Sequence, residues 1–216
     1  MTKKEAKTEA EKQKINQKVH QLITKIDVNP QKTENYLELA TYLLEQGSFV
    51  QATQLLEQAK SLVKEPQDLD YDLAVCYYMQ GEFDKALGLL DQIPNDDLVL
   101  YQKALVYLKL GQPQKALAYA LTIKQIDERV NELLGDIWLN LGEMQQAEAS
   151  YCQISDNKRS AKVNFLLGIT VLATDKEQAK QYLAKSRELD SKYYEQALEQ
   201  YAAILSNIDN QDKQDD

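Results

Sequence analysis

The sequence predicts an all-α fold, a right-handed α-solenoid of stacked helical hairpins. Apolar residues recur at three- and four-residue steps along most of the chain, as they do on the buried face of an amphipathic helix. Turn glycines follow these segments at a near-constant period: Gly47 to Gly81 is 34 residues, Gly81 to Gly111 is 30, and Gly111 to Gly142 is 31. The small number of turn-forming residues, 7 Gly and 4 Pro in 216 residues, argues against a loop-rich β fold.

The N-terminal part is predicted to contain a charged arm and a capping helix. Residues 1–14 are rich in Lys, Glu, Ala and Gln and have almost no apolar face, which predicts a solvated helical arm. From Ile15 onward, apolar residues fall at i, i+4, i+7, i+8 and i+11, so residues 15–30 are predicted to form an N-terminal capping helix. This helix should end before Pro30, because the residue before a proline is disfavoured in the helical region.

About five helical hairpins are predicted between residues 33 and 190. In the stretch 71–93, Leu73, Ala74 and Tyr77 fall on one side of a first helix. After a turn at Gly81, the apolar residues of a second helix again repeat at three- and four-residue steps. Neither helix can bury its apolar stripe alone, so each hairpin must stack on its neighbours.

The C-terminal part is predicted to be a second capping helix followed by a tail. Tyr194, Ala197 and Tyr201 give residues 191–206 one apolar side, as expected of a helix that covers the last hairpin. Residues 207–216 are polar and acidic and are predicted to be disordered.

Small residues have two predicted roles in each hairpin. Turn glycines such as Gly142 supply the left-handed backbone that ends a first helix, a conformation that glycine adopts at least cost. A second set occupies one position inside each first helix, where a small side chain lets the second helix approach closely. This set comprises Ala40, Ala74, Ala104, Gly135 and Gly168.

Together these residues resemble the tetratricopeptide repeat. The pattern of that family is an aromatic residue, then Leu-Gly, then Tyr on the first helix, followed by Ala and an aromatic residue on the second. The nearest match is Leu134-Gly135-x-x-Trp138 with Ala147-x-x-x-Tyr151, and two other units keep Ala in the Gly position. The repeats after Leu90 and after Ala120 are three or four residues short, so their second helices should lose about a turn. The resemblance covers about residues 33–190.

The resemblance implies that the first helices line a concave groove that takes an extended or helical peptide. The face that points into it is out of phase with the core stripe. In this sequence the predicted partner-binding residues are Leu37, Thr41, Leu44, Tyr71, Val75, Tyr78, Tyr101, Leu105, Leu108, Glu132, Asp136, Phe165 and Ile169. Arg129, Leu139, Lys162 and Leu172 belong to the same face. Most of these residues are apolar or aromatic, which suits a binding surface.

The charge of the predicted groove indicates which ligands suit it. Some members of the family grip a carboxylate with Lys, Asn and Arg, but the matching positions here supply no positive charge. They hold Leu37, Thr41, Asp72, Leu98 and Gln102. An apolar or basic-apolar ligand therefore suits this acidic groove better.

The acidic balance of the chain argues against a nucleic-acid partner. The chain carries 25 Lys and Arg against 34 Asp and Glu, a net charge of −9, so most of its surface would repel a phosphate backbone. The sequence shows no signal peptide and no run of membrane-spanning length, which predicts a cytoplasmic protein. Cys76 and Cys152 fit no disulfide framework or metal spacing and are predicted to be small buried apolar residues.

Residue patterns typical of catalysis do not occur in the sequence. It contains no glycine-rich phosphate loop, Cys pair or Ser/His/Asp set, and its single histidine, His20, is predicted to have an exposed structural role. The sequence therefore predicts no enzymatic activity, no cofactor and no metal.

The predicted function is that of a protein–protein interaction scaffold with a protein or peptide partner. Several alternatives stay open. The chain could be a regulatory module that senses a signalling peptide, or it could self-assemble into a homo-oligomer through an exposed end. The predicted groove face could also be partly core, or be filled by a terminal helix of the chain itself.

Overall fold

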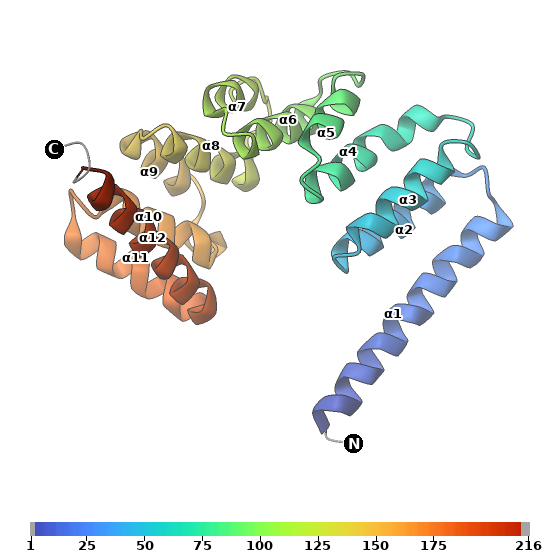
Figure 1. Ribbon diagram of the computed structural model, residues 1–216, viewed down its shortest axis with the longest axis horizontal. Helices are drawn as coiled ribbons and strands as arrows, with labels where there is room; N and C mark the ends of the chain where they lie inside the picture. The colour runs from blue at the N-terminus through green and yellow to red at the C-terminus, as the bar shows by residue number, and fades with distance from the viewer. Residues whose placement is uncertain (1–2, 213–216) are drawn as a thin grey trace. The chain divides into compact units, whose positions relative to one another are not determined.

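The computed structural model describes the backbone of residues 3–212 and the side chains of residues 13–202. This part of the chain is helical and contains no strand (Figure 1). Its α-helices are α1 (Lys3–Val28), α2 (Thr33–Glu45), α3 (Phe49–Ala59), α4 (Asp70–Met79), α5 (Phe83–Leu90), α6 (Asp97–Lys109), α7 (Pro113–Ala120), α8 (Glu128–Asn140), α9 (Met144–Cys152), α10 (Ala161–Val171), α11 (Lys176–Leu189) and α12 (Ser191–Asp212). Short 3₁₀ helices precede α4 (Pro66–Leu69) and α10 (Asp156–Lys158).

The chain forms two compact units, Met1–Leu110 and Gly111–Asp216, called unit 1 and unit 2 below. In unit 1, α2 pairs with α3 and α4 pairs with α5, while α1 packs on α2 and α6 packs on α5. In unit 2, α8 pairs with α9 and α10 pairs with α11; α7 packs on α8, and α12 packs on both α10 and α11. Each unit is therefore a stack of antiparallel helical hairpins, as the period of the turn glycines predicted.

Side chains of neighbouring hairpins share the core of each unit. In unit 1, Leu56 and Ala59 of α3 cluster with Leu73 and Cys76 of α4. In unit 2, Tyr151 at the end of α9 clusters with residues of α10 that include Val163 and Leu167. Because these clusters join one hairpin to the next, no hairpin has a closed core of its own.

The turn glycines have the left-handed conformation predicted from the sequence. Gly47, Gly81, Gly111 and Gly142 are the glycines with positive φ, between 69° and 80°. At Gly142, the glycine N–H donates to the Leu139 carbonyl at 3.1 Å, and the next N–H donates to the Trp138 carbonyl at 2.9 Å. These two bonds form a Schellman motif, which satisfies carbonyls that the end of α8 would otherwise leave unpaired.

The small residues inside the first helices allow close helix packing, as predicted. A Cβ atom placed on Gly135 would lie 2.3 Å from Tyr151 Cε1 of α9, and one on Gly168 would lie 2.7 Å from Leu183 Cγ of α11. No side chain larger than hydrogen fits at either position without displacing the second helix or its side chain.

The expected shortening of two second helices is confirmed. Helices α5 and α7 have 8 residues each and are the shortest second helices of the described hairpins, against 11 in α3, 9 in α9 and 14 in α11. The difference of three residues from α3 is close to one helical turn.

The third repeat departs from the family pattern at Lys103, and the structure explains how a lysine is tolerated there. The Lys103 side chain is buried, but its ammonium reaches Asp91 Oδ1 at 2.8 Å and Asn95 Oδ1 at 3.0 Å. The aliphatic part of the side chain replaces the expected leucine, while the charge is paired at the edge of the hairpin.

Three sequence expectations differ from the structure. Cys152 was predicted to be buried but is exposed, because the adjacent Tyr151 takes the core-facing position on α9 and Cys152 falls about 100° further round the helix. Cys76 is buried as predicted. Within the described residues, no break separates the predicted arm from the predicted capping helix, because one continuous helix, α1, runs from Lys3 to Val28. Helix α12 extends beyond the predicted 191–206 to Asp212, and the rest of the predicted tail, 213–216, lies outside the described residues.

Candidate functional site

The first helices of unit 1 carry the predicted binding face on positions that are mostly half-buried. Only Thr41 is exposed. The residues are Leu37, Thr41 and Leu44 on α2, Tyr71, Val75 and Tyr78 on α4, and Tyr101, Leu105 and Leu108 on α6. Half-burial of this many apolar side chains places them at the boundary between the core and the solvent-facing side of the first helices.

Part of this face also supports the core of unit 1. Leu37 and Leu44 pack against the cluster shared by α2, α3 and α4, and Tyr71 and Tyr78 pack against the cluster shared by α4, α5 and α6. The ring centroid of Tyr78 lies 5.9 Å from that of Phe83, with the rings tilted by 51°. The open alternative that the predicted face is partly core therefore holds for these four residues.

Two side-chain hydrogen bonds fasten α4 to α3. The Tyr77 hydroxyl donates to Glu57 Oε1 at 2.6 Å, and Gln80 Nε2 donates to Thr53 Oγ1 at 2.5 Å. The bond to the Glu57 carboxylate, together with burial, raises the pKa of Tyr77 to about 12. These bonds help to fix the spacing of the hairpins that carry the predicted face.

In unit 2, the predicted face begins with a charged network between α8 and α10. The Lys162 ammonium lies 2.8 Å from Glu132 Oε1 and 2.5 Å from Asp136 Oδ2. The Tyr151 hydroxyl, reaching across from α9, donates to the other carboxylate oxygen of Asp136 at 2.7 Å. Asp136 thus accepts a hydrogen bond on each of its carboxylate oxygens, one from Tyr151 of α9 and one from Lys162 of α10. Glu132, Asp136 and Lys162, with the Tyr151 hydroxyl, are called the charged network below.

The pKa shifts of the charged network follow from its burial and its charges. Burial lowers the pKa of Lys162, but the charges and hydrogen bonds of Asp136 and Glu132 outweigh it, so the pKa rises and the ammonium form is strongly favoured. Burial, followed by the Asp136 charge, raises the pKa of the Tyr151 hydroxyl. Burial also raises the pKa of Tyr193 on α12, which feels the charges of Lys162 and Asp136.

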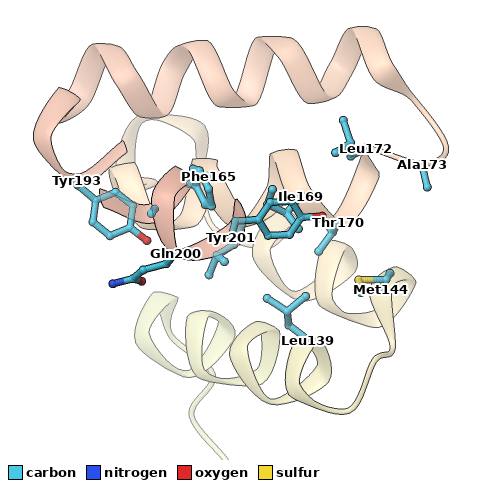
Figure 2. Close-up of a pocket in the computed structure, with 12 residues that line it drawn as sticks. Leu139, Met144, Phe165, Ile169, Thr170, Leu172, Ala173, Tyr193, Gln200 and Tyr201 are labelled. Carbon is cyan, nitrogen blue, oxygen red and sulfur yellow. The ribbon is translucent and has the colours of Figure 1, made fainter. Parts of the chain in front are cut away.

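An apolar cavity of about 630 Å³ follows the charged network along the same helix faces. Figure 2 shows the side chains that line it, which come from α8, α9, α10 with the residues just after it, and α12. The lining residues are Leu139, Met144, Phe165, Leu166, Ile169, Thr170, Leu172, Ala173, Tyr193, Ala197, Gln200 and Tyr201. Leu139, Phe165, Ile169 and Leu172 belong to the face predicted from the sequence.

Helix α12 forms one wall of this cavity and covers part of the predicted face. The rings of Tyr193 and Tyr194 meet Phe165 edge-on, with centroid distances of 6.3 and 5.9 Å. As a result, Phe165 is only 3% exposed, although Ile169, one turn further along α10, is half-buried and reaches the cavity. Helix α12 therefore covers Phe165, a residue of the predicted binding face.

Sequence reasoning missed the contribution of α12 to this cavity. Tyr193, Ala197 and Tyr201 follow each other at four-residue steps, which places them on one side of the helix. From the sequence alone, this spacing predicts only the side by which a capping helix covers its neighbour. That the same side also lines a cavity depends on how α12 packs on α10, and no spacing within one helix reports the packing of two helices.

In the described part of the chain, no helix is long and apolar enough to cross a membrane, and no group of His, Cys, Asp and Glu is arranged to hold a metal ion.

Stacked helical hairpins with apolar side chains along the first helices define a helical-repeat protein. Residues 43–105 match the family model of the tetratricopeptide repeat. This match and the fold of both units support a tetratricopeptide repeat protein, a fold that is typical of protein–protein interaction scaffolds. No curated protein sequence matches the chain significantly.

Several solved structures share this fold. A chain of the APC/C hetero-tetramer Cut9–Hcn1 is 19% identical with a TM-score of 0.70, and the match covers 82% of this chain but 36% of that one. PilF of Pseudomonas aeruginosa is 16% identical with a TM-score of 0.67, over 88% of this chain and 92% of that one. YrrB, described as a TPR protein with an unusual peptide-binding site, is 18% identical with a TM-score of 0.55, over 82% of this chain and 97% of that one. At these identities the likeness concerns the fold alone.

Proposed function

We propose that this chain is a non-catalytic, cytoplasmic scaffold that binds a peptide or helical segment of a partner protein on the first-helix face of unit 2. The cavity between α8, α10 and α12 carries the proposal. Its volume of about 630 Å³ falls within the several hundred Å³ that are typical of sites that bury a bulky ligand group. Its walls are apolar and aromatic. A bulky apolar side chain of a partner would therefore move out of water when it enters the cavity, which favours binding.

The rigidity of the surrounding elements supports this site. Gly135 and Gly168 hold α8 and α10 closely against their second helices, and Lys162 ties α8 to α10. A cavity on packed helices keeps its shape before the partner arrives, so less conformational entropy is lost on binding. The unit 1 face, with Tyr71, Tyr78 and Tyr101, is proposed as a separate surface for a protein or peptide partner.

Binding can be tested with random twelve-residue peptides displayed on phage and selected on the immobilised full-length chain. Enriched peptides are synthesised with a fluorescent label and titrated by fluorescence polarisation. The cavity variant combines Met144→Gln and Leu172→Gln, because both side chains line the cavity and yet are 44% and 37% exposed. The matched control combines Leu189→Gln and Leu198→Gln, which are 49% and 44% exposed in the same unit and do not line the cavity.

The cavity variant should bind the selected peptides about tenfold more weakly, because two partly buried apolar contacts are lost. The control variant should bind like the wild type, and both should keep the helical circular dichroism of the wild type. Equal affinity of the wild type and the cavity variant would contradict binding at this site.

A second candidate function follows from the cover that α12 provides over Phe165. In this alternative the chain is a regulatory module that senses a peptide, and the peptide displaces α12. Replacing Tyr193 and Tyr194 with Ala should then strengthen binding of the selected peptides, because α12 would compete less well for Phe165. Weaker binding would instead assign α12 to the wall of the site.

A further inference from the structure

The charged network and the apolar cavity are two ends of one surface in unit 2. On α8, Glu132, Asp136 and Leu139 are spaced by four and three residues, so they lie on one side of the helix. On α10, Lys162, Phe165 and Ile169 are spaced by three and four residues. The ion pairs from Lys162 to Glu132 and Asp136 set these two rows side by side. The cavity therefore starts about one helical turn beyond the network.

Tyr193 connects the two ends. Its side chain lines the cavity, and the charges of Lys162, Asp136 and Glu132 all act on its hydroxyl. A partner segment in the cavity would lie about one helical turn from Asp136 along α8 and from Lys162 along α10.

The network has an excess of negative charge that is open to solvent. It contains two carboxylates and one ammonium, a net charge of −1. The Glu132, Asp136 and Lys162 side chains are 34%, 20% and 38% exposed. In the described part of the chain, the Glu132 carboxylate forms an ion pair with Lys162 through Oε1. Arg129, one turn before Glu132, is paired with Asp127 at 2.9 Å.

The net charge of the rest of unit 2 is also negative. Unit 2 carries 12 Lys and Arg against 17 Asp and Glu, a net charge of −5. A partner group with negative charge would meet this field as well as the two carboxylates, whereas a positive group would be attracted by both.

We infer that the partner segment presents a Lys or Arg side chain to Glu132 and Asp136 and a bulky apolar side chain to the cavity, about one helical turn apart. In a helical segment this spacing is three or four residues, and in an extended segment it is about two. This inference rests on the proposed function and adds the chemistry of the partner. A single apolar anchor would not fix the direction of the segment, but a charge at one end and an apolar group at the other would.

The selected peptides provide a direct test. They should carry Lys or Arg two to four residues from Leu, Ile, Met, Phe or Trp more often than the unselected library does. The best peptide and a version with its basic residue replaced by Gln are then titrated against the wild type, Glu132→Gln and Glu177→Gln. Glu177 is the matched control because it is an exposed glutamate of unit 2 that is paired with a lysine, Lys180, and that does not line the cavity.

Glu132→Gln should weaken binding of the basic peptide about threefold to fivefold, the size typical of one partly exposed ion pair. It should have no effect on the Gln version of the peptide, and Glu177→Gln should change neither. The difference in affinity for the wild type between the basic peptide and its Gln version should shrink as the salt concentration rises from about 50 to 500 mM.

Two outcomes overturn the inference separately from the proposed function. Peptides with no charge preference, or with Asp or Glu at the stated spacing, would overturn the basic partner while the loss of affinity in the Met144→Gln, Leu172→Gln variant keeps the site. The same holds if Glu132→Gln binds the basic peptide like the wild type. If the Met144→Gln, Leu172→Gln variant binds every selected peptide like the wild type, the proposed site fails, and the inference fails with it.

Discussion

The ring of Tyr151 lies against the backbone of Gly135, so close that a Cβ atom at position 135 would stand 2.3 Å from Tyr151 Cε1. The ring cannot move away easily, because it is fully buried and its hydroxyl donates to Asp136 on the same turn of α8. One glycine therefore sets the distance between α8 and α9, and it also sets the reach of the Tyr151 hydroxyl to the charged network.

Gly135→Ala is expected to destabilise the chain by about 1–3 kcal/mol, because the added methyl group overpacks the contact with Tyr151. Urea unfolding followed by circular dichroism measures this difference. Gly88→Ala is the matched control. Gly88 also lies inside a helix, but no heavy atom lies within 4 Å of its added Cβ atom. It should stabilise the chain by about 0.5–1 kcal/mol through helix propensity alone. Equal effects of the two substitutions would contradict the packing argument.

Gly142 is required because of its backbone conformation and not because of close packing. A Cβ atom there would meet no heavy atom within 4 Å, but the φ angle of Gly142 is +80°. Gly142→Ala should cost about 1–2 kcal/mol in the free energy of unfolding, because alanine is strained in the left-handed region. Gly142→Asn should cost less, because asparagine tolerates that region better than other residues do. The same unfolding experiment checks both values, and an Asn variant less stable than the Ala variant would contradict the backbone explanation.

The bond between Tyr77 and Glu57 should make stability depend on pH in the alkaline range. The pKa of Tyr77 is about 12 in the folded chain and 10.0 as its ordinary value, so folding favours the protonated hydroxyl. The stabilisation from this bond is therefore fully present below pH 10 and is lost as the pH rises from about 10 to about 12. The difference in urea midpoint between the wild type and Tyr77→Phe should be constant from pH 8 to 10 and should shrink above that.

Glu57→Gln provides the second arm of this experiment. Without the carboxylate charge, the Tyr77 pKa should fall towards 10.0, and the ultraviolet titration of the tyrosines should show one group moving to lower pH. A titration curve that stays unchanged in Glu57→Gln would show that burial, and not the carboxylate, holds the proton.

Most of the fold could be predicted from the sequence because each repeat is specified locally. Gly81 and Gly142 mark the ends of first helices through a conformation that other residues avoid, and Gly135 marks a close helix contact through the absence of a side chain. These signals depend on neighbours within one hairpin, so they can be read without knowing the rest of the structure.

The candidate site could be predicted only in part, because it depends on how helices from different repeats meet. The helix faces bearing Leu139 and Ile169 followed from spacing alone. The burial of Phe165 did not, because it results from the packing of Tyr193 and Tyr194 across from another helix. The pairing of Lys162 with Asp136 spans 26 residues, and no spacing rule within a helix reports it.

The different surroundings of the two cysteines give the folded chain a single addressable thiol. Cys76 is buried, and burial raises its pKa to about 11, so at neutral pH it has little of the reactive thiolate and little access to reagents. Cys152, at the end of α9, is exposed. A maleimide dye should therefore couple to Cys152 in the native protein without any engineering. It would place an optical reporter on unit 2, next in sequence to the tyrosine that holds Asp136.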